Sequence, residues 1–130
     1  MIEKIDHIAI AVHNIEDGLK LFKDILGFSL VSRETVEKQQ VKVAKLSAGN
    51  IVIELVEPLA QDSPVGKFLA KRGPGLHHIS LKSNNLEESI KMLQKNSIDS
   101  IGEIGSGSDG TRVIFLHPKQ TLGVLIEIAQ

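Results

Sequence analysis

The sequence predicts an α+β protein made of two tandem βαβββ modules that form a metal-lined β cleft. One observation is a pair of apolar runs, residues 51–57 and 123–130, that are rich in β-branched side chains and have a carboxylate near the middle, Glu54 and Glu127. Such runs are typical of buried strands, and a buried carboxylate costs free energy unless a positive charge lies beside it. The other observation is that the first half of the chain recurs in the second, which indicates a duplicated unit with a cation held between the copies.

The repeat begins with an offset of 71 residues. Residues 77–82 match residues 6–11, and the helix-capping sequence at 85–88 matches that at 14–17. Helical periodicity alone could be a coincidence. Shared identities in the strand starts and in the capping sequence make a duplication the better interpretation.

Module one is expected over about residues 3–57. A strand at 6–12 precedes a helix that Asn14 caps and Gly27 ends. The apolar residues between them recur at helical spacing, at Ile15, Leu19, Phe22, Ile25 and Leu26. Three strands are expected to follow, at 28–36, 41–48 and 51–57.

A linker with a short helix is expected over about residues 58–74, because Ser63-Pro64 combines an N-cap with proline at the first helical position. Module two, about 75–130, then repeats the pattern. Its strands are expected at 77–82, 98–104, 111–116 and 123–130, with a helix after Asn85 and a glycine-rich turn at 105–110. By length the 130 residues form a single domain.

Composition narrows the function classes. With 15 basic and 16 acidic residues, there is no reason to expect binding to nucleic acid or to an anionic membrane. No apolar run approaches the roughly 20 residues that span a bilayer, and the N-terminus has no signal-peptide pattern. The chain has no cysteine, so a metal would need His, Glu, Asp or Gln ligands. A cytoplasmic protein fits these features best.

The repeat pairs His7 with His78 and Glu54 with Glu127. Two imidazoles and two carboxylates suit Zn²⁺, Co²⁺, Ni²⁺, Mn²⁺ or Fe²⁺. If a pseudo-twofold axis relates the modules, the four side chains converge on it. A single histidine on an apolar strand is more often a hydrogen-bonded residue than a ligand, so the prediction depends on the joint match.

The other histidines are weaker candidates. His77 alternates to the opposite face from His78 and is expected outside the site. His13, at a strand-to-helix turn, is expected to be structural. His117 precedes Pro118 in a loop, where it could touch a substrate or nothing.

With these features the chain resembles the vicinal oxygen chelate superfamily, which has the glyoxalase-like fold, over essentially its whole length. Within it, the chain looks like the methylmalonyl-CoA epimerase family. The matching motifs are Asp6-His7-Ile8-Ala9-Ile10-Ala11-Val12, Ser63-Pro64-Val65-Gly66-Lys67-Phe68-Leu69, Gly75-Leu76-His77-His78-Ile79, Phe115-Leu116-His117-Pro118-Lys119 and Gly123-Val124-Leu125-Ile126-Glu127. The first is common to the superfamily, whereas the Leu-His-His end and the His-Pro-Lys loop are more specific.

The resemblance implies metal ligands at His7, Glu54, His78 and Glu127, and a divalent ion (Co, Mn, Ni or Zn). It implies proton abstraction at C2 of an acyl-CoA thioester by Glu127, and a homodimer. The family sometimes has Gln where this chain has Glu54, and Glu is what bacterial glyoxalase I has there. Some members are proposed to use a third-strand Glu as second base. Residues 40–46 contain no carboxylate, so Glu54 is the predicted second base, with water or Lys45 as alternatives.

The candidates for holding the phosphates of CoA are the cationic side chains Lys67, Lys71, Arg72 and Lys119, and His117 is a further candidate for substrate binding. The main alternative activity is that of glyoxalase I (lactoylglutathione lyase), which moves a proton in a glutathione hemithioacetal with the same ligands. A second alternative is a non-catalytic binding protein of this fold, although such proteins often lose the metal ligands. A dioxygenase is disfavoured, because its iron site has one carboxylate, not two.

Overall fold

A computed structural model describes all residues, 1–130. It divides the chain into two compact units, one of His7–His77 and the other of Met1–Asp6 with His78–Gln130. The organisation of residues 1–130 as a single domain stays a prediction. None of the helices is both long enough and apolar enough to cross a lipid bilayer.

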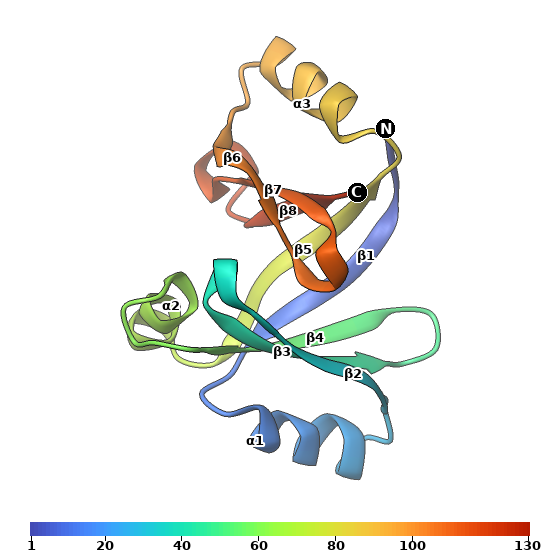
Figure 1. Cartoon of the computed structure of the whole chain (residues 1–130), viewed down its shortest axis with the longest axis vertical. Coiled ribbons are helices and arrows are strands. Elements are labelled where there is room, and N and C mark those ends of the chain that lie inside the picture. Colours follow the sequence, from blue (N-terminus) through green and yellow to red (C-terminus); the bar gives the residue numbers. More distant parts are fainter. The chain divides into compact units, whose positions relative to one another are not determined.

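The His7–His77 unit contains the first βαβββ module and the helix that follows it (Figure 1). Its elements are β1 (Ile2–Ala11, of which residues from His7 onward belong here), α1 (Ile15–Leu19), η1 (Lys20–Ile25), β2 (Ser29–Val36), η2 (Glu37–Gln39), β3 (Val41–Ser47), β4 (Val52–Pro58) and α2 (Pro64–Arg72). The strand order is β2-β3-β4-β1. Strand β1 runs parallel to β4, and the other neighbours are antiparallel.

The second unit has the same topology. Its elements are β5 (Gly75–Ser83, of which residues from His78 onward belong here), α3 (Leu86–Lys95), β6 (Ser100–Ser106), η3 (Ser108–Gly110), β7 (Arg112–Leu116), η4 (Pro118–Gln120) and β8 (Ile126–Ala129). The order is β6-β7-β8-β5, again with the first and last strands parallel. The predicted α+β class and the duplicated βαβββ pattern are therefore confirmed.

In each unit the strand with the central carboxylate also fixes the start of the helix. Glu57, three residues after the first of these carboxylates, accepts a hydrogen bond from the backbone N–H of Ile15 at 2.9 Å. Gln130, three residues after the second, accepts one from the N–H of Leu86 at 2.7 Å. Each bond satisfies one of the backbone donors that a helix N-terminus leaves open.

The predicted N-caps are also confirmed. The side chains of Asn14, Ser63 and Asn85 each accept a hydrogen bond from a backbone N–H in the first turn of α1, α2 and α3. These caps fix where each helix leaves the preceding segment, as their residue types favour.

Strand β6 begins and ends two residues later than the predicted 98–104, so it extends into the predicted glycine-rich turn. Three other elements differ more. The expected helix over 15–26 is α-helical only to Leu19 and continues as a π-helix, in which Phe22 packs on Phe28 with ring centroids 5.5 Å apart. The last strand begins at Ile126 instead of residue 123, because Gly123 takes a left-handed conformation (φ 87°) in the preceding turn. The first strand begins at Ile2 instead of residue 6.

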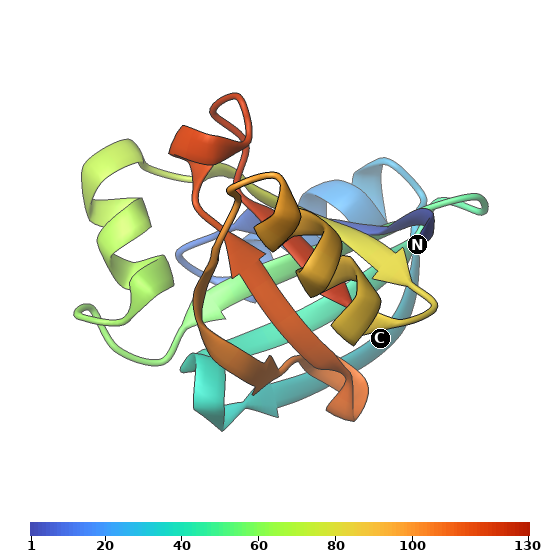
Figure 2. The ribbon, with the colours of Figure 1, turned by 90° about the horizontal axis from the view of Figure 1, so that it is seen from above.

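Helices α1 and α3 each cover one face of their group of strands, whereas α2 packs through Val65 and Leu69 on the other face of the first group. In the first unit, Ile15 and Leu19 of α1 pack on Ala44, Leu46 and Leu55 of β3 and β4. In the second, Leu86 of α3 packs on Ile114, Leu116 and Ile128 of β7 and β8, and Figure 2 shows this helix lying across those strands. Because side chains alternate along a strand, the residues on either side of Leu55 and Ile128 point to the other face. The central carboxylates lie there.

Candidate metal centre

The first unit brings together His7 of β1 and Glu54 of β4. Ala9, two residues after His7, is the direct strand partner of Glu54, so the two side chains share one face of the strands. Both are buried, each with 5% of its surface exposed, and His7 Nε2 lies 3.3 Å from Glu54 Oε2. The structure thus brings these two side chains together, and their role as metal ligands stays a prediction.

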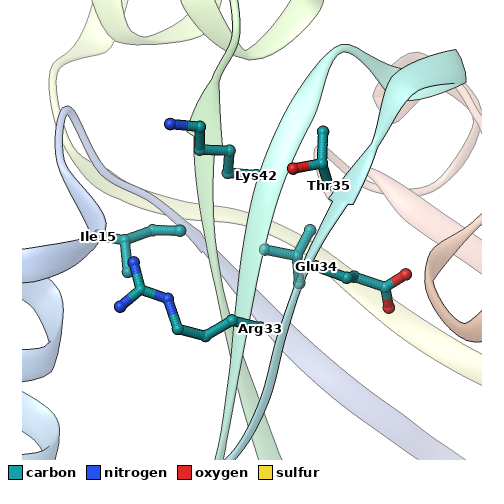
Figure 3. Close-up of a pocket in the computed structure, with 6 residues that line it drawn as sticks. Ile15, Arg33, Glu34, Thr35 and Lys42 are labelled. Atoms are coloured by element: carbon teal, nitrogen blue, oxygen red, sulfur yellow. The ribbon is translucent and has the colours of Figure 1, made fainter.

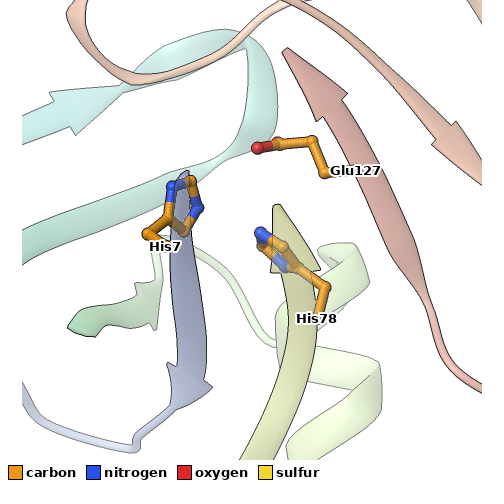
Figure 4. Close-up of side chains that lie close together, drawn as sticks. All are labelled: His7, His78 and Glu127. Carbon is orange, nitrogen blue, oxygen red and sulfur yellow. The ribbon is translucent and has the colours of Figure 1, made fainter. Parts of the chain in front are cut away.

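The second unit brings together His78 of β5 and Glu127 of β8. Their side chains are 8% and 4% exposed, and a ligand atom of each lies within 4.8 Å of the other; Figure 4 draws both residues, along with His7. Ser80, two residues after His78, is the strand partner of Glu127, as Ala9 is of Glu54. Each module therefore contributes a buried histidine and glutamate from equivalent strand positions.

The two carboxylates have different neighbours on the next strand. Lys45 of β3 is the direct partner of Glu54, which places a cationic side chain beside this carboxylate. Phe115 of β7 is the direct partner of Glu127, and its ring also packs edge-on against the imidazole of His78 at 5.4 Å. Glu54 thus has a polar, cationic neighbour, whereas Glu127 has an aromatic one.

The donor set fits a divalent metal ion. Nitrogen and oxygen ligands lie about 2.0–2.2 Å from such an ion, so two ligands of one ion stand about 3.0–3.5 Å apart. The 3.3 Å between His7 Nε2 and Glu54 Oε2 falls in this range. Burial of both carboxylates is costly without a compensating positive charge, which a divalent ion supplies.

His77 points away from the candidate centre, as its alternation with His78 predicts. Its ring packs edge-on against Phe68 of α2 at 4.9 Å, and burial lowers its pKa. His13 is exposed at the β1–α1 turn. His117 is also exposed, and its Nδ1 accepts a hydrogen bond from the backbone N–H of Lys119 at 3.1 Å, which caps η4.

The residues predicted to contact CoA are exposed. Lys71 and Arg72 lie in the last turn of α2, where the Arg72 guanidinium is 5.6 Å from the centre of the Phe68 ring. Lys67 and Lys119 are exposed as well. Their role in substrate binding stays a prediction.

A surface pocket of about 270 Å³ lies at β2 and β3, but no predicted metal ligand lines it (Figure 3). Its cationic residues are engaged by acidic neighbours: Arg33 pairs with Glu16 at 2.7 Å and Lys42 with Glu57 at 3.8 Å. Figure 3 shows the Glu34 carboxylate pointing away from Arg33 and Lys42. This pocket is therefore distinct from the candidate centre.

Sequence reasoning missed one polar residue at the candidate centre. Ser80 is completely buried, and its hydroxyl has no hydrogen-bond partner within the protein. The signal was present in the repeat, because Ser80 stands where the first module has Ala9. A polar residue at one copy of an apolar position in a duplicated strand is a candidate for a functional difference between the copies.

The family model described as Glyoxalase/Bleomycin resistance protein/Dioxygenase superfamily matches residues 6–115. The chain belongs to this superfamily. It is 41% identical over 128 residues to the uncharacterized protein YqjC of Bacillus subtilis, covering 98% of this chain and 91% of that protein. It is 37% identical over 129 residues to human mitochondrial methylmalonyl-CoA epimerase, covering 98% of this chain and 73% of that protein.

The fold of this chain is also similar to that of solved structures. A variant of Streptomyces coelicolor methylmalonyl-CoA epimerase in complex with 2-nitronate-propionyl-CoA matches with a TM-score of 0.92 and 33% identity, covering 99% of this chain and 97% of that one. The predicted resemblance to the vicinal oxygen chelate epimerases is thus confirmed, and this superfamily member is an isomerase.

Proposed function

We propose that this superfamily member epimerises methylmalonyl-CoA at C2 by proton abstraction, with a divalent metal ion held by His7, Glu54, His78 and Glu127. The observation that supports it best is the equivalent buried histidine–glutamate pair in each module. Its similarity to methylmalonyl-CoA epimerases, one of them in complex with an acyl-CoA, supports the substrate class.

Glu127 is the proposed base. Its carboxylate removes the C2 proton, and the electrons of the broken C–H bond delocalise onto the thioester oxygen as an enolate. Its strand partner Phe115 packs edge-on against the His78 imidazole, so an aromatic ring lies beside both side chains.

Inversion requires a proton to return to the opposite face of the planar enolate. We assign this step to Glu54, which the duplication makes the counterpart of Glu127: in its carboxylic acid form Glu54 gives its proton to C2, its O–H bond breaks, and it is left as the carboxylate. Lys45, its strand partner, keeps a positive charge beside the Glu54 carboxylate. When bound, a divalent ion (Co, Mn, Ni or Zn) supplies Lewis-acid stabilisation of the charge that develops on oxygen.

The remaining assignments follow from the family resemblance. Lys71, Arg72, His117 and Lys119 are the proposed contacts to the CoA portion, and the active form is a cytoplasmic homodimer. Light scattering on the purified protein tests the oligomeric state. Charge-removing variants of the four side chains should raise KM for the CoA thioester without changing kcat.

The direct experiment follows the C2 proton of methylmalonyl-CoA in D₂O with Co²⁺-loaded protein, by NMR or mass spectrometry. The wild-type protein should incorporate deuterium rapidly. Glu127→Gln should slow incorporation by about 10²–10⁴-fold, the usual contribution of a positioned base. Glu57→Gln is the control, because it is the same substitution at a carboxylate that accepts a hydrogen bond from the backbone N–H of Ile15 at the start of α1. It should leave the rate nearly unchanged.

If the metal-loaded wild-type protein incorporates no deuterium at C2, the epimerase proposal is wrong. The glutathione hemithioacetal is then the substrate to test, because glyoxalase I chemistry uses the same kind of ligand set. Inactivity on both, with metal bound, would favour the non-catalytic binding protein.

A further inference from the structure

Ser80 is exceptional among the buried serines of this chain. It is 0% exposed, yet its hydroxyl has no hydrogen-bond partner within the protein. The other two wholly buried serines are satisfied: the Ser83 hydroxyl forms a hydrogen bond with that of Ser89 at 2.7 Å, and Ser63 donates to the carbonyl of Ala60 at 2.6 Å. No hydrogen bond within the protein therefore explains why residue 80 carries a hydroxyl.

The duplication shows that the fold does not need a hydroxyl at this position. Ala9 occupies the equivalent place in the first module, is equally buried, and is the strand partner of Glu54 as Ser80 is of Glu127. An unpartnered buried hydroxyl is destabilising, so alanine would be the better choice for packing alone. A serine here is explained if the hydroxyl acts on something that the second module has and the first lacks.

The geometry identifies that neighbour. Directly paired residues on adjacent strands point to the same face, and the strands lie about 4.8 Å apart. Ser80 is paired with Glu127, and His78 lies on the same face two residues earlier. A rotation about the Cα–Cβ bond of Ser80 thus brings its hydroxyl toward the Glu127 carboxylate.

We infer that Ser80 is a positioning residue: its hydroxyl donates a hydrogen bond to one carboxylate oxygen of Glu127 when the metal-loaded protein is formed. The other oxygen is then held in place for the proton transfer. This inference rests on the proposed function. It also accounts for a difference between the modules, because Glu54 has a methyl group and an ammonium group as strand neighbours, whereas Glu127 has a hydroxyl and an aromatic ring.

The test compares Ser80→Ala with Ser83→Ala, two identical truncations of fully buried serines on the same strand. Three quantities are measured for each variant: the melting temperature without metal, the Co²⁺ affinity by calorimetry, and the deuterium exchange rate of methylmalonyl-CoA. Ser80→Ala should keep or raise the melting temperature. It should weaken Co²⁺ binding by about 10–100-fold, as loss of a hydrogen bond to a ligand does.

The deuterium exchange rate should fall in Ser80→Ala but not in Ser83→Ala, as the Co²⁺ affinity does. Ser80→Ala should lower kcat by about tenfold to a hundredfold with KM unchanged, because a hydrogen bond to a charged group is lost. Ser83→Ala should lower the melting temperature, since it breaks the bond to Ser89, but leave affinity and kcat unchanged. If Ser80 acted in folding alone, Ser80→Ala would lower the melting temperature and leave the Co²⁺ affinity and kcat unchanged.

Equal Co²⁺ affinity in Ser80→Ala and the wild type would overturn the inference and leave the proposed function intact. So would a lower melting temperature of Ser80→Ala, since it would reveal a structural partner for the hydroxyl. Absence of metal binding by the wild-type protein would overturn the proposed function and, with it, this inference.

Discussion

Metal-dependent stabilisation tests the proposed ligand set module by module. An ion that binds only the folded protein, at a free concentration a hundredfold above its dissociation constant, adds about 2.7 kcal/mol to the free energy of unfolding. Globular proteins gain about 2.1 cal/mol/K of unfolding entropy per residue, so for this chain 1 kcal/mol corresponds to roughly 4 °C. Co²⁺ should therefore raise the melting temperature of the wild-type protein by about 10 °C.

Removing a ligand should remove most of this rise. Even residues that only orient a ligand contribute about 10–100-fold to metal affinity, so loss of a ligand should cost at least the upper value. At the same free Co²⁺, the remaining stabilisation is about 0.4 kcal/mol, or 1–2 °C. We expect this result for His7→Ala, Glu54→Ala, His78→Ala and Glu127→Ala alike, measured by scanning calorimetry with and without Co²⁺.

The refuting outcome is specific. If the variants of one module lose the stabilisation while those of the other keep about 10 °C, a single module holds the ion and the four-ligand proposal is wrong. His117→Ala is the control, because His117 is exposed and bonds only within its own loop; it should keep the full rise. A chelator should reverse the wild-type effect.

The remaining predictions concern pH and the scaffold. The Co²⁺-dependent rise should shrink as the pH is lowered, because imidazole must lose its proton to bind a metal ion; melting curves across pH test this. Glu57→Ala and Gln130→Ala should each lower the free energy of unfolding by about 1 kcal/mol in urea titrations, since each leaves a helix N-terminal N–H without its acceptor. Gly66→Ala should destabilise by roughly 1–3 kcal/mol, because a Cβ there would lie 2.5 Å from two backbone carbonyl oxygens. Gly75→Ala, which meets no atom within 4 Å, should change stability by less than about 0.5 kcal/mol.

The scaffold could be predicted because its signals are local. Asn14, Ser63 and Asn85 cap helices through bonds that span two or three residues, and such patterns are visible in sequence. The pairing of His7 with Glu54 spans 47 residues, and only the repeat made it predictable. Without a second copy, each would have been an isolated polar residue on an apolar strand.

What the sequence did not reveal depends on strand register. That Lys45 opposes Glu54, and that Phe115 opposes Glu127, follows from the alignment of β3 with β4 and of β7 with β8, which a shift by one residue would change. The missing partner of the Ser80 hydroxyl can be recognised only when all its neighbours are known. The π-helical end of the first helix likewise reflects packing of aromatic rings from different segments.

In the proposed mechanism, these register-dependent neighbours would divide the tasks between two equivalent carboxylates. In the proposed reaction Glu127 accepts a proton and Glu54 gives one up, and an ammonium group beside Glu54 stabilises the carboxylate that is left. Exchanging the neighbours tests this reasoning directly. Lys45→Phe, which gives Glu54 the neighbour that Glu127 has, should leave deuterium exchange at one face of C2 intact while changing the rate of inversion. An unchanged ratio of exchange to inversion would show that the neighbours do not divide the roles and that the difference lies in the substrate's position.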